Sequence, residues 1–378
     1  MMKDTVFQQI MKPINDKLID ECLIQFNSDY DYEKFKTKDH LRAMIFSNLC
    51  EIKSLRALEV AINEKKIGIL SKVKRSTLSD ANRKRTAQAF FWILDKLMTL
   101  LPKKRCKEIK EVKEAIRLLD SSPIQLRGTG YEWAKEHATR HIEGLKLHVE
   151  YDLAFESPVK AVISHPNCND VVMGQQWPIS PGTLYIFDKG YYDFNWWWDI
   201  HQKGASFVTR LKDNAAICMI ENKTVISETV LEDSIFKFKN KNPRGGKVNL
   251  YQENLRRVSI KREGKKPLIL VTNRHDLSGE VIGELYKARW QIELFFKWIK
   301  QNLKLKKFLG RSANAVKIQI ATALIAYLLV QIFKNATEDA RPLYLVITWV
   351  RYNLDLKKPQ HRGLSPPEYC FQREPVQL

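Results

Sequence analysis

Apolar residues in the first 115 positions recur at the spacing of helices. Three groups show this most clearly: Ile14, Leu18 and Cys22; Leu41, Met44, Ile45 and Leu49; and Leu55, Leu58 and Ala61. Each group puts its side chains on one face of a helix with 3.6 residues per turn, and no alternation of period two competes with it. The pattern predicts an all-helical N-terminal domain over residues 1–115.

A basic stretch near the middle of this region predicts a further helix. Ser76 or Ser79 can cap its start, and we expect the helix to continue past Phe90 to Leu94. Its early turns would present three polar residues to a DNA groove, as in a helix-turn-helix: Asn82, Arg83 and Arg85. A solvated helix face explains the same residues about as well, so both interpretations stay open.

Short runs with β-type spacing follow between residues 116 and 212. The expected strands lie at 116–120, 145–151, 159–163, 184–187 and 207–211. A short helix over 192–202, with three consecutive tryptophans, can cover a sheet made of these strands. Strands and helices in this order predict an α/β layered domain.

The rest of the chain alternates between strands and long helices. Residues 213–266 form a less regular, lysine-rich segment with possible strands at 234–239 and 255–261, which we interpret as a β-rich insertion. A strand at 267–273 comes next. One long helix is expected from about 278 to 303, and a second from about 313 to 333.

No segment is expected to cross a membrane or direct export. The longest apolar run, Ile320 to Val330, is far shorter than the roughly 18 to 20 residues that a bilayer requires, so it predicts a buried helix. The N-terminus lacks the apolar core of a signal peptide. The six cysteines include no Cys-x-x-Cys pair, which argues against a zinc ribbon or a disulfide framework. We therefore expect a cytoplasmic protein.

Positive charge is concentrated in three stretches. The formal net charge is +20, yet residues 51–115 carry +9, residues 234–267 carry +9 and residues 286–311 carry +7. The remainder is therefore net negative. Basic stretches on an otherwise acidic chain are typical of contact with a nucleic-acid backbone.

Two aspartates follow apolar runs that are expected to be strands. Asp120 ends Leu118-Leu119-Asp120, and Asp188 ends Tyr185-Ile186-Phe187-Asp188. Ligands and catalytic groups gather at the carboxyl ends of strands in α/β sheets. An Asx-type turn is the alternative for either residue alone, but two such positions together favour a functional site.

The helix around Glu293 carries one acid among several cations. At 100° per residue, one narrow face collects five polar residues, and Trp290 borders it: Tyr286, Arg289, Glu293, Lys297 and Lys300. An intrahelical pair of Arg289 and Glu293 is the simpler interpretation, but it leaves the excess of cations unexplained. Three carboxylates could instead hold two divalent ions about 3.5–4 Å apart for in-line displacement at phosphorus.

These residues resemble a known family, the DDE transposases of bacterial insertion sequences, of the insertion-sequence-four type. The family signature of Tyr, two residues, Arg, three residues, Glu, six residues and Lys stands here as Tyr286, Arg289, Glu293 and Lys300. The segment 187–194 resembles the family's second-Asp motif, and Leu119-Asp-Ser-Ser122 resembles its first. The segments 54–58 and 76–82 resemble its N-terminal helical domain, so the resemblance covers nearly the whole chain.

The resemblance implies a ribonuclease-H-like catalytic core interrupted by a mainly β insertion. The core would comprise residues 116–212 and 267–310, around the insertion 213–266, with a C-terminal helical region at 311–378 and a DNA-end-binding domain at 1–115. By similarity, Asp120, Asp188 and Glu293 would bind two divalent ions, Mg²⁺ or Mn²⁺ in its place. Asp152 is a minor rival of Asp120.

The resemblance also implies the remaining roles. Four residues would grip the phosphates of the transposon end: Tyr286, Arg289, Lys297 and Lys300. Trp290 would stack on or pack beside a displaced base. The protein would bind double-stranded DNA at inverted-repeat ends and at the target, as a homodimer in a synaptic complex, and would move its element by cut-and-paste transposition.

Other functions were weighed against this one. His137 and His141 are four residues apart but lack the intervening Glu of a zinc hydrolase helix, so that class is excluded. A nuclease or resolvase of the same fold would share the three acids without requiring the Tyr, Arg and Lys residues. A transposase-derived DNA-binding protein without activity would tolerate loss of an acid, and all three are present.

Overall fold

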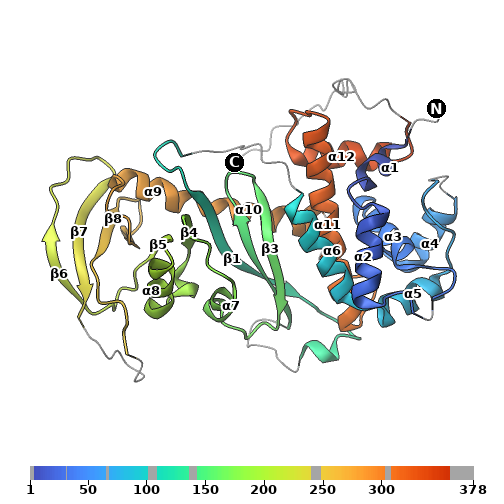
Figure 1. Ribbon diagram of the computed structural model, residues 1–378, viewed down its shortest axis with the longest axis horizontal. Helices are drawn as coiled ribbons and strands as arrows, with labels where there is room; N and C mark the ends of the chain where they lie inside the picture. Colours follow the sequence, from blue (N-terminus) through green and yellow to red (C-terminus); the bar gives the residue numbers. More distant parts are fainter. Residues whose placement is uncertain are drawn as a thin grey trace.

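The computed structural model describes residues 4–30, 32–64, 68–100, 109–135, 143–239, 248–302 and 308–357. Helices fill one end of the molecule and a mixed sheet fills the other (Figure 1). The helices before the sheet are α1 (Val6–Met11), α2 (Asp16–Phe26), α3 (Thr37–Leu49), α4 (Leu55–Glu64), α5 (Arg75–Lys84) and α6 (Ala87–Thr99).

The predicted helix through the basic stretch is divided in two. It ends at Lys84 and restarts after Thr86, because Arg85 has extended backbone (φ −71°, ψ 130°) and Thr86 caps α6 through its side chain. Lys74 takes the N-cap position, where Ser76 or Ser79 was expected. The reason is local: the buried apolar positions of α5 and α6 lie on two separate faces that one straight helix could not present.

The described strands form one nine-stranded sheet in the order β3-β2-β1-β4-β5-β9-β8-β7-β6. Their bounds are β1 (Ala115–Gln125), β2 (Gly144–Asp152), β3 (Ser157–Ser164), β4 (Thr183–Phe187), β5 (Ser206–Arg210), β6 (Ile217–Asn222), β7 (Val230–Phe238), β8 (Leu255–Ile260) and β9 (Leu268–Thr272). Strands β4 and β5 run parallel to β1, and the other pairings are antiparallel. This is a mixed α/β architecture, as the order of strands and helices in the sequence predicts.

The segment interpreted as an insertion continues this sheet. Strand β8 pairs with β9 over residues 256–260, and β7 and β6 add to it in turn. The strands expected at 234–239 and 255–261 are present as β7 and β8, whereas β6 was not expected. Its side chains are mostly exposed, so its sequence shows little of the alternation that a half-buried strand would have.

Helices cover both faces of the sheet. Neighbouring residues of β1 point to opposite faces, and Ser121 bonds to Asp170 in α7 (Asp170–Gln176) while Ser122 bonds to Lys300 in α10 (Trp290–Asn302). The face with α7 also carries α8 (Phe194–Gln202), whose Trp197 is fully buried. Short 3-10 turns lie at Glu132–Ala134 and Lys189–Tyr191.

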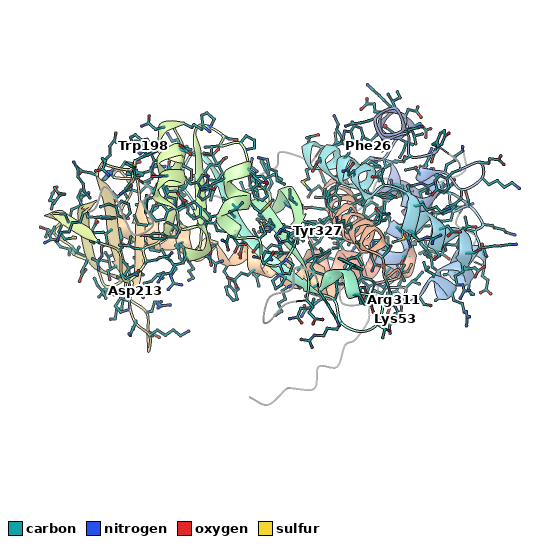
Figure 2. All side chains as sticks on the ribbon, turned by 90° about the horizontal axis from the view of Figure 1, so that it is seen from below. Phe26, Lys53, Trp198, Asp213, Arg311 and Tyr327 are labelled. Carbon is teal, nitrogen blue, oxygen red and sulfur yellow. The ribbon has the colours of Figure 1, made fainter. Side chains whose placement is uncertain are left out.

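The helix α11 (Ala313–Ala336) joins the two ends of the molecule. It packs on α1, α3, α5 and α6 and also on α10, and its most apolar window is 89% buried. By length and composition it is the one helix of the described ranges that could cross a bilayer, but this burial is that of a core helix. Figure 2 shows Tyr327 of α11 at the junction. The helix α12 (Leu343–Asn353) then returns to α1.

Candidate active site

Two parallel strands bring the first two acids together. Leu119 of β1 pairs in register with Phe187, the last residue of β4, so Asp120 and Asp188 follow neighbouring positions. The prediction that Asp120 ends its strand is wrong, because β1 continues to Gln125 against β2. The register of β1 with β4, however, ends at the pair of Leu119 and Phe187. Asp120 therefore stands where the parallel pairing stops.

Asp120 is a buried carboxylate in a negative environment. Burial raises its pKa to about 7; the Ser121 N–H and Arg289 act in the opposite direction, and the charges of Asp188 and Glu293 raise it further. Ser121 N donates to its Oδ1 over 2.8 Å. A carboxyl group with so high a pKa holds a proton near neutral pH unless a cation compensates its charge.

Asp188 begins a tight turn after β4. Its Oδ1 accepts a hydrogen bond from Gly190 N at 2.7 Å, and Thr209 of β5 donates to its carbonyl oxygen at 3.3 Å. The Asx-type turn weighed from the sequence is therefore present. It fixes the side chain at the strand end and leaves Asp188 half-buried.

The third acid, Glu293, lies on α10, and the expected single helix is broken just before it. Helix α9 (Gly279–Ala288) ends at Ala288 with Arg289 as its C-cap, and Trp290 starts α10. The two bonds around the break span three residues, from Arg289 N to the Tyr286 carbonyl and from Ile292 N to the Arg289 carbonyl, each 3.2 Å. The local tightening separates Tyr286 and Arg289 from the helix that carries Glu293.

Arg289 bridges two of the acids. Its Nη1 lies 3.2 Å from Asp120 Oδ2, and its Nη2 donates to Glu293 Oε1. The guanidinium is 16% exposed, and its carbon lies 5.8 Å from the centre of the Tyr286 ring. The pair of Arg289 and Glu293 weighed from the sequence is present, but it extends across to β1.

An open pocket of about 450 Å³ collects the acids and lysines from β1 and α10. Its walls include Asp120, Glu293, Lys297 and Lys300. Lys300 donates to Ser122 Oγ at 2.6 Å, which ties α10 to β1, and Lys297 is exposed. Trp290 is 57% exposed beside this surface, and Tyr286 is buried. The expected basic surface thus borders the acids.

The donor chemistry suits hard divalent ions, which prefer carboxylate oxygens. Among the described residues, however, no three His, Cys, Asp or Glu side chains lie close enough together to hold one ion. The guanidinium of Arg289 stands between Asp120 and Glu293 and supplies their counter-charge. The acids fit the ions by chemistry, and Arg289 would have to leave for them to close on an ion.

The expected DNA contacts in the N-terminal helices are only partly at the surface. Asn82 is 2% exposed and shares a hydrogen bond of 2.9 Å with His40 Nε2. Arg85 is also buried, and it donates to the carbonyl oxygens of Ser28 and Phe35. Both residues stabilise the helical packing, so their expected role in a DNA groove does not fit. Arg83 is exposed and pairs with Asp80 at 3.1 Å.

The minor rival of Asp120 is engaged elsewhere. Asp152 lies opposite Arg117 in register, and its Oδ2 is 2.9 Å from Arg117 Nη1. A buried carboxylate with its own cation has a structural role that needs no metal. His137 and His141 lie outside the described residues.

Sequence reasoning missed three polar residues around the acids. Ser122 receives Lys300, while Ser121 and Asp170 bond to each other on the opposite face. The two serines stood in the first-Asp motif without a role. Asp170 begins a helix of only seven residues, too short for a periodic pattern, and its acidic first turn was the one available indication.

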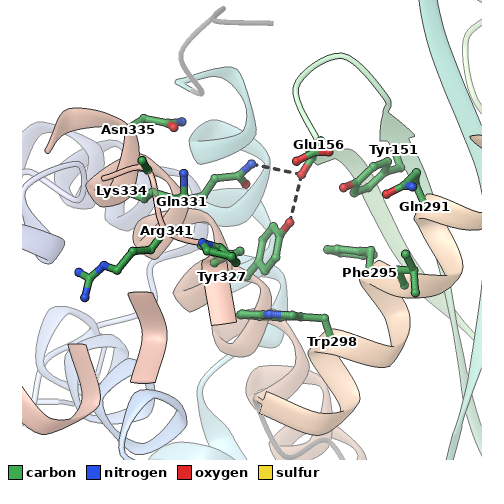
Figure 3. Close-up of a pocket in the computed structure, with 14 residues that line it drawn as sticks. Tyr151, Glu156, Gln291, Phe295, Trp298, Tyr327, Gln331, Lys334, Asn335 and Arg341 are labelled. Carbon is green, nitrogen blue, oxygen red and sulfur yellow. Dashed lines mark hydrogen bonds between the residues drawn. The ribbon is translucent and has the colours of Figure 1, made fainter. Parts of the chain in front are cut away.

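A second pocket, of about 340 Å³, lies on another side of α10 (Figure 3). Four aromatic side chains line it together with polar and aliphatic ones: Tyr151, Phe295, Trp298 and Tyr327. None of the three acids lines it. Here Tyr327 and Gln331 of α11 donate to the Glu156 carbonyl, each over 3.1 Å, which attaches α11 to the turn between β2 and β3.

Comparison with known families places the acids in a recognised region. A family model described as a transposase DDE domain matches residues 111–329, and one described as a domain of unknown function matches residues 2–67. The first spans β1 to α11, including all three acids. The second covers the first four helices.

Individual relatives agree with this match. A putative transposase, y4zB, from Sinorhizobium fredii is 35% identical over 70% of this chain and 73% of its own. A probable transposase for insertion sequence element IS5377 from Geobacillus stearothermophilus is 27% identical over 71% of each chain. A solved piggyBac transposase synaptic complex with hairpin DNA has a TM-score of 0.50 at 8% identity, covering 93% of this chain and 79% of that one, so it supports the fold alone.

Proposed function

Since the chain belongs to the DDE transposases of bacterial insertion sequences, of the insertion-sequence-four type, we propose that it moves its element by cut-and-paste transposition. It binds the terminal inverted repeats, hydrolyses the phosphodiester at each transposon end and transfers the 3′ hydroxyl to target DNA. The pocket that combines Asp120 and Glu293 with Lys297 and Lys300 is the observation that carries this proposal.

In this proposal, Asp120, Asp188 and Glu293 hold two divalent ions, Mg²⁺ or Mn²⁺ in its place. When bound, such ions activate a water molecule and neutralise charge at the reacting phosphate. The raised pKa of Asp120 supports the assignment, because a buried acid among other acids gains most from a cation. Asp188, held by its turn, presents a carboxylate at the end of β4.

The basic residues around the pocket bind the DNA strand. Lys297 is exposed and can reach a phosphate. Lys300 binds a phosphate from where its ammonium group donates to Ser122 Oγ. With Asp120 and Glu293 committed to ions, Arg289, beside Tyr286, would be available to bind a phosphate. Trp290, exposed next to them, stacks on or packs beside a displaced base.

The partners are double-stranded transposon ends and target DNA, and the assembly is a homodimer in a synaptic complex. The helices of residues 1–115 recognise the ends, with Arg83 as an exposed cation available for a phosphate. The site of action is the bacterial cytoplasm. The alignment with the relative from Sinorhizobium fredii covers 70% of this chain. That relative therefore supports the assignments only for the aligned residues.

Two alternatives make different predictions. A nuclease or resolvase of the same fold would cut DNA without joining 3′ ends to a target. A transposase-derived binding protein would retain DNA and cut nothing. The basic surface beside the acids favours a transposase over a nuclease, because a joining reaction must hold the cut end after hydrolysis.

The decisive experiment uses a duplex that carries the element's terminal inverted repeat, with Mg²⁺. We expect wild-type protein to cut and join it, and Asp188→Ala to lose at least 1000-fold in rate (a rough estimate) while still binding the ends. Asp213→Ala is the matched control, because Asp213 is an exposed acid whose carboxylate lies near Lys189. Cutting by Asp188→Ala at the wild-type rate would refute the assignment, and cutting without joining would favour the nuclease.

A second experiment tests the DNA-binding role of Lys297. Removing one phosphate contact should lower the salt dependence of end binding, so Lys297→Ala should reduce the slope of log K against log salt by about 1. Lys297→Arg keeps the charge and should keep the slope. A filter-binding titration between low and high salt measures both, and an unchanged slope in Lys297→Ala would leave this residue on a solvated face.

A further inference from the structure

A fourth carboxylate, Asp170, lies beside Asp188 on the face of the sheet opposite α10. A β-carbon built on Gly190 would lie 2.9 Å from Asp188 Oδ1 and 3.1 Å from Asp170 Oδ2. Two carboxylate oxygens from different elements therefore converge on one small space, kept open by the lack of a side chain at Gly190. Asp188 Oδ1 also accepts from Gly190 N, and negative oxygens that border one space favour a cation between them.

The other oxygen of Asp170 is firmly held. Ser121 Oγ donates to its Oδ1 at 2.7 Å, Lys146 Nζ lies 3.2 Å away and His148 Nδ1 lies 3.6 Å away. Burial lowers the pKa of His148 to about 4, so its ring is neutral and leaves Lys146 as the cation. No described residue donates to Oδ2. The carboxylate is thus fixed by one oxygen and presents the second to the space beside Gly190, which Asp188 Oδ1 also borders.

A buried phenol lies near the same acids. Tyr191 is 1% exposed, and its hydroxyl has no hydrogen-bond partner among the described residues. Burial raises its pKa well above the ordinary value, and the charges of Asp170, Asp120 and Asp188 add to this effect. Buried polar atoms are rarely left unpaired, so a hydroxyl of this kind points to a ligand or to water held by one.

We propose that Asp170 and Asp188 together bind one divalent cation on the α7 side of β4, with the Tyr191 hydroxyl bonded to a water of that ion. The inference rests on the proposed function, which gives Asp188 a cation but gives Asp170 no part. Oxygen donors from two carboxylates and water suit Mg²⁺ or Mn²⁺. Ser121 joins Asp170 to Asp120, so the new ligand is tied to the first acid of the site.

The alternative is that Asp170 only pairs with Lys146 and starts α7. Asp170→Asn separates the two, because the amide oxygen still accepts from Ser121 while the negative oxygen facing Asp188 is lost. Electron paramagnetic resonance of added Mn²⁺ counts bound ions on the full-length protein without DNA. We expect Asp170→Asn to lose one ion or to weaken binding at least tenfold, and the control Asp213→Asn to match wild type.

The outcomes separate this inference from the proposed function. Asp188→Asn should weaken Mn²⁺ binding in either case. If it does so while Asp170→Asn binds as wild type, the role of Asp170 is refuted and the proposed function stands. If wild type binds no Mn²⁺, or Asp188→Asn leaves Mn²⁺ binding unchanged, the metal assignment is refuted. This inference, which rests on it, is then refuted too.

A wild-type experiment covers the case in which Asp170→Asn does not fold. Fe²⁺ in place of Mn²⁺, with ascorbate and peroxide, generates hydroxyl radicals that cleave the backbone next to the bound ion. We expect cuts near residues 170 and 188 to 191, suppressed by excess Mg²⁺, when the fragments are mapped by mass spectrometry. Cuts near 188 and 293 without cuts near 170 would overturn the proposal.

Discussion

At the scale of single residues, the aspartates in and near the site differ in which cations and hydrogen-bond donors offset their negative charge. Asp152 has Arg117 as its own cation, and Asp188 has the amide of its turn. Asp120 has the Ser121 amide and part of Arg289, which do not offset its burial. The three aspartates therefore differ in chemistry although their sequence contexts look alike. Of the three, Asp120 is the aspartate whose negative charge is least compensated by its neighbours.

Because the pKa of Asp120 is raised in the folded protein, the free energy of unfolding depends on pH. The folded protein keeps a proton on Asp120 up to about pH 7, whereas the unfolded chain releases it near pH 4. The resulting stabilisation is fully present below about pH 4 and is lost as the pH rises to about 7. Asp120→Asn stays neutral throughout, so it should gain on wild type by up to about 4 kcal/mol at high pH.

Urea unfolding between pH 4.5 and 8.5, in chelator, measures this difference. The gap between Asp120→Asn and wild type should widen with pH and level off above about pH 7. A gap that stays constant across the series would mean that Asp120 is ionised throughout.

At the scale of elements, long-range polar contacts join strands and helices that sequence patterns treat separately. Arg256 of β8 is the clearest case. Its Nε and Nη2 bond to both oxygens of Asp233 in β7, at 2.9 and 2.6 Å, and Nη1 donates to the Leu277 carbonyl just before α9. The guanidinium is almost fully buried. It therefore fixes the outer strands to the start of the α9–α10 unit.

Lysine cannot reproduce this fork, because its single ammonium cannot serve all three acceptors. Arg256→Lys should lower the free energy of unfolding by about 2 kcal/mol. Arg257→Lys is the matched control on the same strand: its partner Glu232 is largely exposed, so about 0.5 kcal/mol or less is expected. Urea unfolding compares the two, and equal effects would show that the buried fork adds nothing special.

Local patterns predicted the elements well and their arrangement poorly. The five strands at 116–211 and the long helix α11 follow from alternation and apolar spacing, which depend on neighbours in sequence. The break at Arg289, the burial of Asn82 and Arg85, and the place of Asp170 depend on contacts between distant residues. Of the site, the spacing of Tyr286, Arg289, Glu293 and Lys300 was informative because it was local. The domain bounds stay a prediction.

At the scale of the whole molecule, α11 is the element on which both halves depend. Thr322 accepts a hydrogen bond from Asn48 of α3, and Tyr327 donates to Glu156 beside the sheet. Seventeen of its 24 residues are buried, although it follows α10 in sequence. The N-terminal helices and the family-matched region 111–329 thus share one hydrophobic core.

The shared core predicts that neither part folds alone. A fragment of residues 109–378 would expose the face of α11 that packs on α3 and α6, and such a large apolar surface drives aggregation. We expect this fragment to be insoluble or to bind a hydrophobic dye, and co-expression with residues 1–108 to rescue it. A soluble, cooperatively unfolding 109–378 fragment would show that the two parts are independent.

Arg289 also bears on when the site becomes reactive. It pairs with Asp120 and Glu293 and so supplies part of their counter-charge in the folded protein. Under the proposed function, ion binding has to displace Arg289 from the two acids, so it is a step distinct from folding. Under the proposed function, the folded protein reacts with DNA only after this exchange, which restrains cutting of the host DNA.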